Sequence, residues 1–526
     1  MKLSDESNYT LSYPNHSLYQ NLLMVANKIP EKIAVVEGQK NYSYKELITD
    51  SNKLAFFLDY SGIGKEDTVA ILLNNSYYFI ISLFACFQVG AKVVLLNPRL
   101  SEKDISNNFI DSDAIALITE SELKEKFSTA IKHHAFNIKI ITDSYAYIKP
   151  TENDYVLIES ILEKNDFYTE DQSQSNSVAL LLYTGGTTGL PKAVVLSHYN
   201  LLANSIQFNT ALDRKERNPE KTIVLGVLPF YHSFGLMVCV FSPLFKGSKI
   251  VVLPKFDPKK VWEIIIKENI TELYAVPTMY VALTVEKIPV KNLKLEICVS
   301  GGAPLAKELG EKFYRLTGVK ICEGYGLTEC SPVTHLNPPD SPKLGSIGLP
   351  LPDTKAKIID PETEQNIMIE GEIGELVIKG PQVMLGYYKK GIESIKTFTS
   401  DGWLRTGDLA SIDDEGFFFI VDRLKEVIIS GGLKIYPREV EELVFKIPGI
   451  AYTALIGIPD EYYGEVGKLY VVKKEGYNIS KEQITEFLKN KIATYKIPKE
   501  IEFVDSLPLS GPGKIAKREL EKLNNR

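Results

Sequence analysis

Residues 178–192 read VALLLYTGGTTGLPK, and this stretch joins an apolar run to a loop rich in glycine and threonine. The run Val178–Tyr183 predicts a buried strand, because a short unbroken apolar segment suits a strand covered on both faces. Glycines in the loop allow positive φ angles and a close approach of the backbone to a ligand. Backbone N–H groups together with a lysine form a cradle for phosphate. The residues that would supply this cradle are Thr184, Gly185, Gly186, Thr187, Thr188, Gly189 and Lys192.

The loop is not a Walker A motif. That motif requires a glycine, four intervening residues and then Gly-Lys-Ser/Thr, and neither Gly185 nor Gly186 has this continuation. A flexible surface loop is the alternative interpretation. The position of the loop directly after a buried strand favours phosphate binding instead.

Strands and helices alternate on both sides of this stretch. Further β-branched apolar runs predict strands at Ile223–Leu228, Lys249–Leu253, Glu272–Val276 and Leu295–Ser300. Pro258–Glu268 and Pro304–Leu316 have helical character. This alternation predicts α/β layers with largely parallel sheets.

The region before the loop follows the same pattern. Ser43-Tyr44-Lys45-Glu46 is a capping-box sequence, which predicts a helix start. Phe79–Leu96 is the most apolar stretch, but Gln88, Gly90 and Lys92 interrupt it. A membrane span needs about 20 apolar residues, so we expect a buried helix ending near Gly90 and then a strand at Lys92–Leu96.

The sequence changes in character after about Pro338. Short strand and turn patterns at Gly345–Pro352, Gly374–Gly380 and Gly416–Val421 predict a small β-rich subdomain. Mixed α/β patterns then resume, with a helix at Pro437–Phe445, a strand at Ala451–Gly457 and a helix at Lys481–Lys491. We therefore predict the α/β class. A large multi-layer N-terminal domain, residues 1–424, would carry the β-rich subdomain, and a small mobile α+β domain would span residues 425–526.

Composition excludes several classes of protein. The 526 residues are 44% hydrophobic and 24% charged, as in ordinary globular chains, and the formal net charge is −7. An acidic chain is a poor candidate for nucleic-acid binding. The five cysteines form no Cys-x-x-Cys pair, which disfavours a zinc site or a disulfide framework. A polar start without an apolar core indicates no secretory signal, so we expect a cytoplasmic protein.

The chain resembles the adenylate-forming superfamily, which includes acyl-CoA synthetases, luciferases and the adenylation domains of peptide synthetases. Among these it looks most like medium- and long-chain fatty acyl-CoA synthetases. The resemblance extends from about Leu18 to Leu520 and rests on segments that occur in the family's order. Besides the loop at 184–192, these are Asn97-Pro98, residues 229–235 (PFYHSFG), 300–305 (SGGAPL), 325–329 (YGLTE), 403–408 (WLRTGD), 422–425 (DRLK) and 513–515 (GKI).

The resemblance implies a two-step reaction. ATP and a carboxylic acid form an acyl-adenylate with release of pyrophosphate, and the thiol of coenzyme A then attacks the anhydride. The first step brings an anionic carboxylate up to an anionic triphosphate, so cations must neutralise both. ATP, Mg²⁺ and coenzyme A are therefore implied.

Roles for individual residues follow from the same resemblance. Lys192 and the loop at 185–189 would hold the β- and γ-phosphates, Thr328 would contact the α-phosphate, and Glu329 would bind Mg²⁺. Alternatively, Glu329 is a helix-start carboxylate favoured by the helix dipole. Lys514 would bridge the substrate carboxylate and the phosphate, although a solvated surface lysine is the ordinary interpretation of any single lysine.

Other positions match the nucleotide and coenzyme contacts of the family. Gly302, Ala303 and Tyr325 would pack on the adenine, although Tyr325 could be a core aromatic. Asp408 and Arg423 would bind the ribose, although Asp408 could be only a turn residue. Lys425 would be the hinge of the mobile domain. Pro304, Gly326 and Ile420 complete the nucleotide-binding set, and Gly431 and Gly432 would help to form the pantetheine tunnel.

The acyl substrate is predicted from the segment around His232. This histidine matches one that lines the carboxylate site of fatty-acyl and aryl-CoA synthetases, and residues 232–237 contain no carboxylate to bind a substrate ammonium group. An uncharged, apolar acyl group is implied. Gly186, where many relatives have Ser, favours fatty acids. Ala193 replaces the usual Gly and would cost about 1 kcal/mol or more if that position needed a positive φ.

Several functional alternatives remain open at this stage. A cinnamate-like aromatic acid is the nearest competitor to a medium- or long-chain fatty acid. The acceptor could be a separate carrier protein instead of free coenzyme A. An oxidising relative of the luciferase kind and a non-catalytic nucleotide-binding protein are less favoured. Peripheral membrane contact stays open, and so does the choice between monomer and homodimer.

Overall fold

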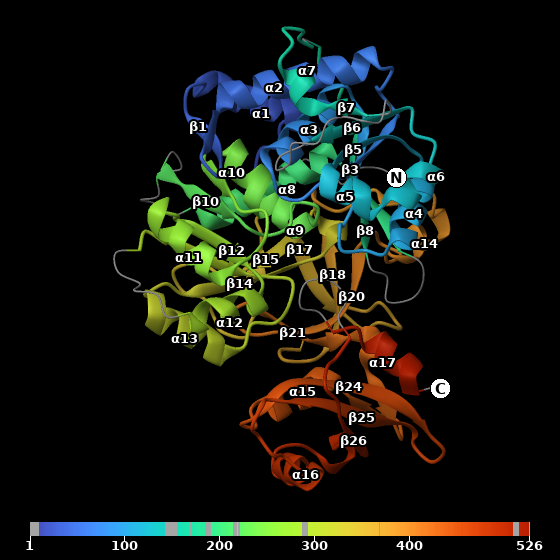
Figure 1. Cartoon of the computed structure of the whole chain (residues 1–526). Coiled ribbons are helices and arrows are strands. Elements are labelled where there is room, and N and C mark those ends of the chain that lie inside the picture. The colour runs from blue at the N-terminus through green and yellow to red at the C-terminus, as the bar shows by residue number, and fades with distance from the viewer. Residues whose placement is uncertain are drawn as a thin grey trace. The chain divides into compact units, whose positions relative to one another are not determined.

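The computed structural model describes residues 10–142, 155–168, 170–184, 191–213, 218, 221–286, 293–367, 369–508 and 515–524. The chain divides into two compact units. Unit 1 comprises residues 1–355 and 379–402, and unit 2 comprises residues 356–378 and 403–526. Figure 1 gives the element labels used below.

An eight-stranded sheet forms the first layer of unit 1. Its five pairs from β8 to β7 are parallel, whereas β9 and β19 are antiparallel additions at one edge. The order is β19 (Gly386–Tyr387), β9 (Lys192–Ser197), β8 (Val178–Thr184), β4 (Lys92–Leu95), β3 (Thr68–Leu72), β5 (Ala114–Glu120), β6 (Ile138–Thr142) and β7 (Val156–Leu157).

A nine-stranded sheet forms the second layer of unit 1. The pairs from β14 to β1 are parallel, and antiparallel strands flank them at both edges. The order is β16 (Leu349–Pro350), β15 (Val333–Leu336), β14 (Ile321–Gly326), β13 (Ile297–Ser300), β12 (Glu272–Ala275), β10 (Ile223–Gly226), β11 (Lys249–Val252), β1 (Ile33–Glu37) and β2 (Lys40–Ser43).

Helices cover these two sheets, and α1, α2 and α3 pack on one another (blue in Figure 1). The helices of unit 1 are α1 (Leu18–Lys28), α2 (Tyr44–Tyr60), α3 (Tyr77–Gln88), α4 (Glu102–Asp111), α5 (Ser121–Lys126), α6 (Ser128–His133), α7 (Ile158–Leu162), α8 (His198–Leu212), α9 (Ser233–Leu236), α10 (Ser242–Phe245), α11 (Pro258–Lys267), α12 (Pro277–Val285), α13 (Lys307–Thr317) and α14 (Gly391–Lys396). The π-helix η3 (Met237–Phe241) and the 3₁₀ helix η4 (Thr328–Cys330) complete the set.

Local sequence signals account for several of these elements. Ser43 and Glu46 form the predicted capping box, in which each side chain accepts a hydrogen bond from the other residue's backbone N–H. Such a cap stabilises a helix by about 1 kcal/mol. The apolar stretch after Phe79 is buried in α3, and Gly90 has a φ of +79° before β4 begins at Lys92. Among the described residues, no helix combines the length and apolar character that crossing a bilayer requires.

Unit 2 contains two sheets. The first has the order β17 (Lys355–Ile359), β18 (Gly374–Lys379), β20 (Leu404–Ile412) and β21 (Phe418–Arg423). The second has the order β23 (Leu433–Ile435), β22 (Ile428–Ser430), β25 (Gly464–Lys473) and β24 (Ile450–Asp460), with β26 (Glu500–Phe503) also paired to β25. The helices are η5 (Leu424–Glu426), α15 (Pro437–Phe445), α16 (Lys481–Lys489), η6 (Thr494–Lys496) and α17 (Lys517–Asn524).

The core of the second sheet in unit 2 lies on both of its faces. Leu455 packs with Leu469 and Val440 in one buried cluster, whereas its neighbour Ile456 packs with Leu520 in another. Successive residues of a strand point to opposite faces, so α15 and α17 cover the two sides of one sheet. This α+β arrangement was expected for the C-terminal residues.

Two details of the predicted organisation are wrong. The segment predicted as a strand of the β-rich subdomain at 345–352 contributes β16 to the large sheet of unit 1. The helix predicted at 304–316 begins at Lys307, because residues 301–306 form a turn after β13.

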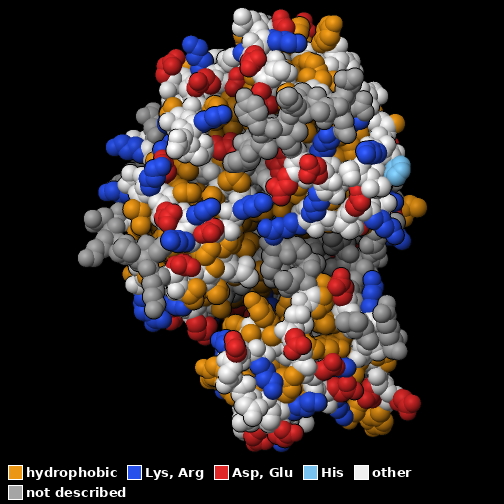
Figure 2. Space-filling view, viewed as in Figure 1, with side chains coloured by type: hydrophobic (Ala, Val, Ile, Leu, Met, Phe, Trp, Pro, Cys, Tyr) orange, Lys and Arg blue, Asp and Glu red, His pale blue; other side chains and the backbone are white. Residues whose placement is uncertain are grey.

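The compact units also group the small sheet β17–β18–β20–β21 with the C-terminal residues. The predicted division at residues 424 and 425 concerns a rotation of the C-terminal domain, and it stays a prediction. Figure 2 shows basic and acidic side chains interspersed over the viewed face of each unit, as the scattered charges of the sequence lead one to expect.

Candidate active site

Several predicted site residues of unit 1 follow the carboxyl ends of parallel strands in the nine-stranded sheet. Strands β10, β12, β13 and β14 are mutually parallel, so their carboxyl ends lie at one edge of the nine-stranded sheet. The His232 turn follows β10, the Gly302 turn follows β13, and Thr328 and Glu329 follow β14. Ligands of α/β sheets bind at this edge.

The His232 turn is tightly built. The backbone N–H of His232 donates to Pro229 O at 3.1 Å, and a Cβ on Gly235 would lie 2.2 Å from the same oxygen, so only glycine fits there. His232 is exposed and caps α9, because its Nδ1 accepts a hydrogen bond from the Phe234 N–H at 3.3 Å.

Sequence reasoning missed Asn75, which fixes the start of this turn. Its side chain is buried, with Nδ2 donating to Leu228 O at 2.7 Å and Oδ1 accepting from the Phe230 N–H at 2.8 Å. The pairing joins the end of β3 to the loop after β10, which are far apart in sequence. No local sequence pattern predicts such a contact.

Replacing Asn75 with Ala should destabilise unit 1. Several buried backbone groups would lose their partners, and each such loss costs about 1–3 kcal/mol. We expect the free energy of unfolding to fall by about 3 kcal/mol in urea titrations. Asn74→Ala is the matched control, because Asn74 is only half-buried and bonds to Glu120. Equal stability of Asn75→Ala and the parent protein would contradict this role.

Thr328 and Glu329, the predicted α-phosphate and magnesium contacts, lie directly after β14. They begin η4, and the hydroxyl oxygens of Thr328 and Ser233 lie 3.1 Å apart, which links β14 to the His232 turn. Glu329 is half-buried, and its Oε1 accepts a hydrogen bond from the Tyr387 hydroxyl at 2.8 Å. The backbone oxygen of Glu329 also accepts from the Met384 N–H at 2.8 Å. Tyr387 therefore belongs to the site, although the sequence analysis did not include it.

Thr184 and Lys192 are placed opposite each other at the end of the β8–β9 hairpin. The loop residues between them, Gly185, Gly186, Thr187, Thr188 and Gly189, lie outside the described residues. The ammonium nitrogen of Lys192 lies 4.9 Å from the ring centroid of Tyr387. Lys192 and Glu329 thus share one aromatic neighbour.

The structure resolves the question raised by Ala193. This residue is buried in β9, pairs with Tyr183 on β8 and belongs to the apolar core beneath the sheet. It is not among the residues with a positive φ. The backbone at this position is extended, so the alanine carries none of the strain that a left-handed conformation would impose.

The residues predicted to contact adenine lie on two adjacent turns of unit 1. Gly302 has a φ of +79° and is exposed, with Ala303 half-buried and Pro304 exposed after it. Tyr325 is half-buried and packs edge-on against His335, with 6.0 Å between ring centroids. A Cβ on Gly326 would lie 2.0 Å from Pro332 O, which explains the glycine at this position.

The predicted ribose contacts lie in unit 2. Asp408 and Arg423 are cross-strand partners on β20 and β21, with 3.7 Å between the Asp408 Oδ1 and the Arg423 Nε. Ile420 pairs with Ala410 on the same two strands. Both charged side chains keep part of their surface exposed, so they are available to ligand hydroxyls.

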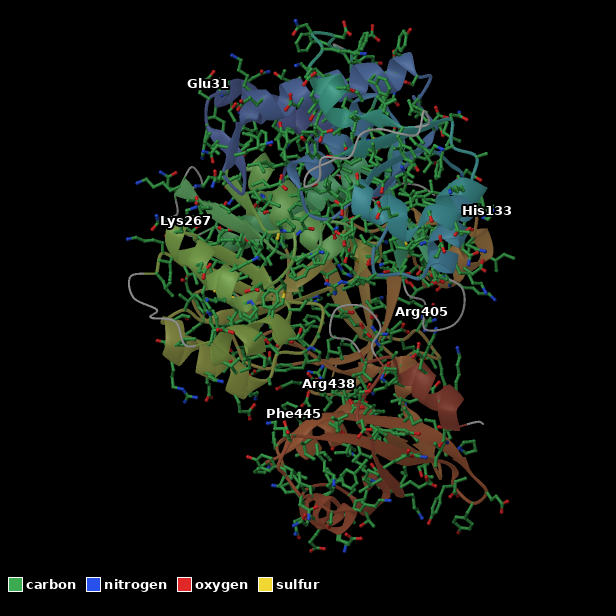
Figure 3. All side chains as sticks on the ribbon, viewed as in Figure 1. Glu31, His133, Lys267, Arg405, Arg438 and Phe445 are labelled. Carbon is green, nitrogen blue, oxygen red and sulfur yellow. The ribbon has the colours of Figure 1, made fainter. Side chains whose placement is uncertain are left out.

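The predicted hinge is crossed by hydrogen bonds within unit 2. Lys425 lies exposed in η5. On its C-terminal side, Arg438 (labelled in Figure 3) donates its backbone N–H to Asp422 at 2.8 Å and its Nη1 to Ile420 O at 2.9 Å. Burial raises the pKa of Asp422 to about 6. A rotation about Lys425 would have to break these bonds.

The segment after the predicted catalytic lysine is firmly anchored. Lys514 itself lies outside the described residues. Lys517 begins α17 and lies 2.8 Å from Glu441 and 3.0 Å from Glu426. Burial alone would lower its pKa, but the carboxylates of Glu441 and Glu426 raise the pKa of Lys517 above its usual value. All three residues follow Lys425, so they would move together.

Gly431 and Gly432 form the turn between β22 and β23. Both have positive φ angles, +57° and +82°, as a two-residue hairpin turn requires. The Gly431 N–H donates to Tyr463 O at 2.7 Å, and a Cβ on Gly432 would meet no atom within 4 Å. The backbone at Gly432 is therefore open to close approach.

Two sheets of largely parallel strands, with polar turns at the carboxyl ends of the strands, are typical of α/β proteins that bind ligands at this edge. Comparison with known proteins identifies the family. The AMP-binding enzyme family matches residues 23–388, and the AMP-binding enzyme C-terminal domain matches residues 439–514.

Relatives align over almost the whole chain. A long-chain-fatty-acid–CoA ligase of Bacillus subtilis is 36% identical, with 97% of this chain and 95% of the relative aligned. A feruloyl-CoA synthase of an Amycolatopsis species is 34% identical, with 94% and 97% aligned. The solved structure of o-succinylbenzoate CoA synthetase from Bacillus subtilis, with its acyl-adenylate intermediate, has a TM-score of 0.84 and 29% identity, and covers 97% of this chain and 99% of that one.

The chain belongs to the AMP-binding enzyme family, the adenylate-forming enzymes, and within it to the AMP-forming acyl-CoA ligases. Use of ATP, Mg²⁺ and coenzyme A follows from this membership. The resemblance drawn from the sequence is confirmed, and so is the α/β fold class.

Proposed function

We propose that this protein converts a medium- or long-chain fatty acid to its coenzyme A thioester through an acyl-adenylate, with release of pyrophosphate. One observation carries the choice of acid. The His232 turn leads directly into α9 and η3, and all residues of Met237–Phe241 are buried among apolar neighbours. Residues 232–241 contain no carboxylate that could bind a cationic substrate group. The Bacillus subtilis relative supports the same choice of acid.

The charged groups of the site suit the first half-reaction. Lys192 and Glu329 both contact the side chain of Tyr387, and the Thr328 hydroxyl lies 3.1 Å from the Ser233 hydroxyl of the His232 turn. A triphosphate placed here would meet the positive charge of Lys192, the Thr328 hydroxyl and the His232 imidazole. These groups would lower the repulsion between an incoming carboxylate and the phosphates. Lys514 would complete the charge compensation in the adenylating state.

The donor atoms around Glu329 fit a magnesium ion. Mg²⁺ prefers oxygen ligands and binds through one or two carboxylates together with substrate phosphates. Glu329 offers one such carboxylate, and Thr328 and Ser233 add neighbouring hydroxyl oxygens. When bound, the ion would neutralise phosphate charge. We therefore propose Glu329 as its protein ligand, with Asp408 and Arg423 holding the ribose and Gly302, Ala303 and Tyr325 the adenine.

An aromatic acid is the second candidate substrate. The feruloyl-CoA synthase relative is 34% identical, close to the value for the fatty-acid ligase. An aromatic ring would need a shallower binding pocket than an alkyl chain, and that pocket would also have to lack charged groups. A separate carrier protein as acceptor is the third alternative. We expect a cytoplasmic enzyme, either a monomer or a homodimer.

The test is acid-dependent exchange of pyrophosphate into ATP. We expect exchange with hexanoate or palmitate to exceed exchange with acetate, cinnamate or amino acids by at least about tenfold, since each buried methylene contributes about 0.8 kcal/mol. Added coenzyme A should then give a thioester. If exchange were strongest with cinnamate, the substrate would be an aromatic acid and not a fatty acid. Exchange without any thioester would indicate a carrier protein.

A further inference from the structure

Tyr387 is held against the strand that carries Lys192. It lies on β19, which pairs with β9 so that Tyr387 faces Val194 and Gly386 faces Val195. The Leu385 N–H donates to Val195 O at 3.0 Å, and the Tyr387 N–H donates to the Ser394 hydroxyl at 2.8 Å. Backbone bonds on both sides therefore fix where the ring stands.

The side chain of Tyr387 contacts both charged groups of the phosphate end of the site. Its hydroxyl donates to Glu329 Oε1 at 2.8 Å, and its ring centroid lies 4.9 Å from the Lys192 nitrogen. A phenol donating to a carboxylate is a charge-assisted hydrogen bond. An ammonium group over an aromatic ring gains cation–π attraction. One residue thus orients an anion and a cation that come from different sheets.

The two contacts of Tyr387 order the side chains of Glu329 and Lys192. Glutamate and lysine side chains lose much rotamer freedom when they are ordered. If these side chains are already ordered before the ligand binds, the entropy cost of ordering them does not weaken binding.

We propose that Tyr387 is a positioning residue, which holds Glu329 for Mg²⁺ with its hydroxyl and Lys192 for the phosphates with its ring. This inference rests on the proposed function, because it takes Glu329 as the magnesium ligand and Lys192 as a phosphate contact. The two contacts are separable. Tyr387→Phe removes the hydroxyl and keeps the ring, whereas Tyr387→Leu removes both.

The experiment is calorimetric titration of the full chain with ATP, over a range of Mg²⁺ concentrations and in EDTA, without any acid. For Tyr387→Phe we expect about tenfold weaker ATP binding at low Mg²⁺, restored by excess Mg²⁺, and unchanged binding in EDTA. For Tyr387→Leu we expect weaker binding under all conditions. A merely structural role would weaken binding equally with and without the ion.

Tyr388→Phe is the matched control. Its hydroxyl donates to Asp113 at 2.9 Å and not to Glu329. We expect it to match the parent protein, and melting temperatures check that every variant is folded. If Tyr387→Phe showed the same Mg²⁺ dependence as the parent protein, the inference about Tyr387 would be overturned, but the proposed function would not. Failure of the parent protein to bind ATP would overturn the proposed function and this inference with it.

Discussion

Lys514→Ala should lower the rate of acyl-adenylate formation by about a thousandfold, while thioester formation from preformed acyl-AMP stays within about threefold of the parent rate. The physical reason is charge. In the proposed mechanism Lys514 bridges the substrate carboxylate and the phosphate as the anhydride forms, and loss of one such donor costs about 10²–10³ in rate. The second half-reaction no longer brings two anions together, so it does not need this cation.

The measurement is a pair of single-turnover assays, one starting from fatty acid and ATP, the other from synthetic acyl-AMP and coenzyme A. Lys489→Ala is a suitable control, because Lys489 lies on the exposed side of α16, where its ammonium group pairs with the neighbouring Glu486 at 3.1 Å. If both half-reactions slowed equally, Lys514 would act on the fold or on domain rotation and not on adenylation.

Glu329→Gln should lower the rate of adenylate formation by about a hundredfold and raise the Mg²⁺ concentration that gives half the maximal rate. Glutamine has the size of glutamate and can still accept a hydrogen bond from the Tyr387 hydroxyl, so the change removes mainly the negative charge. A neutral amide oxygen is a weaker ligand for a hard cation than a carboxylate. The expected loss corresponds to roughly 2–3 kcal/mol of transition-state stabilisation.

This variant is measured by initial adenylation rates across a magnesium series, with the melting temperature as a check of folding. Glu308→Gln, at an exposed position of α13, is the control and should behave as the parent protein. An unchanged Mg²⁺ requirement in Glu329→Gln would exclude this residue as the magnesium ligand. The alternative interpretation, a carboxylate at a helix start that the helix dipole favours, would then explain Glu329 better.

Much of the secondary structure could be predicted from local patterns. The capping box at Ser43, the end of α3 before Gly90 and the helix at Pro437–Phe445 were predicted at or within two residues of their observed positions. These signals are local, because they depend on caps, glycine stops and apolar periodicity. The segment at 345–352 was placed in the wrong sheet, since turn residues reveal a strand but not its partner.

The site divides in a similar way. Motif order pointed to Lys192, Thr328, Glu329 and His232, and the carboxyl ends of parallel strands bring the last three to one edge of a sheet. Asn75 and Tyr387 were missed. Each acts through a contact with a residue more than fifty positions away, and nothing in the local sequence marks either one.

The sequence by itself determined the α/β class and the family, because caps, apolar periodicity and the ordered motifs depend on neighbouring residues. Only the tertiary structure decided that Ala193 is an unstrained strand residue, that Asn75 fixes the His232 turn, and that Tyr387 joins Glu329 to Lys192. These facts depend on strand pairing and on packing between two sheets. Such pairings are set by the burial of whole faces, and no short stretch of sequence carries them.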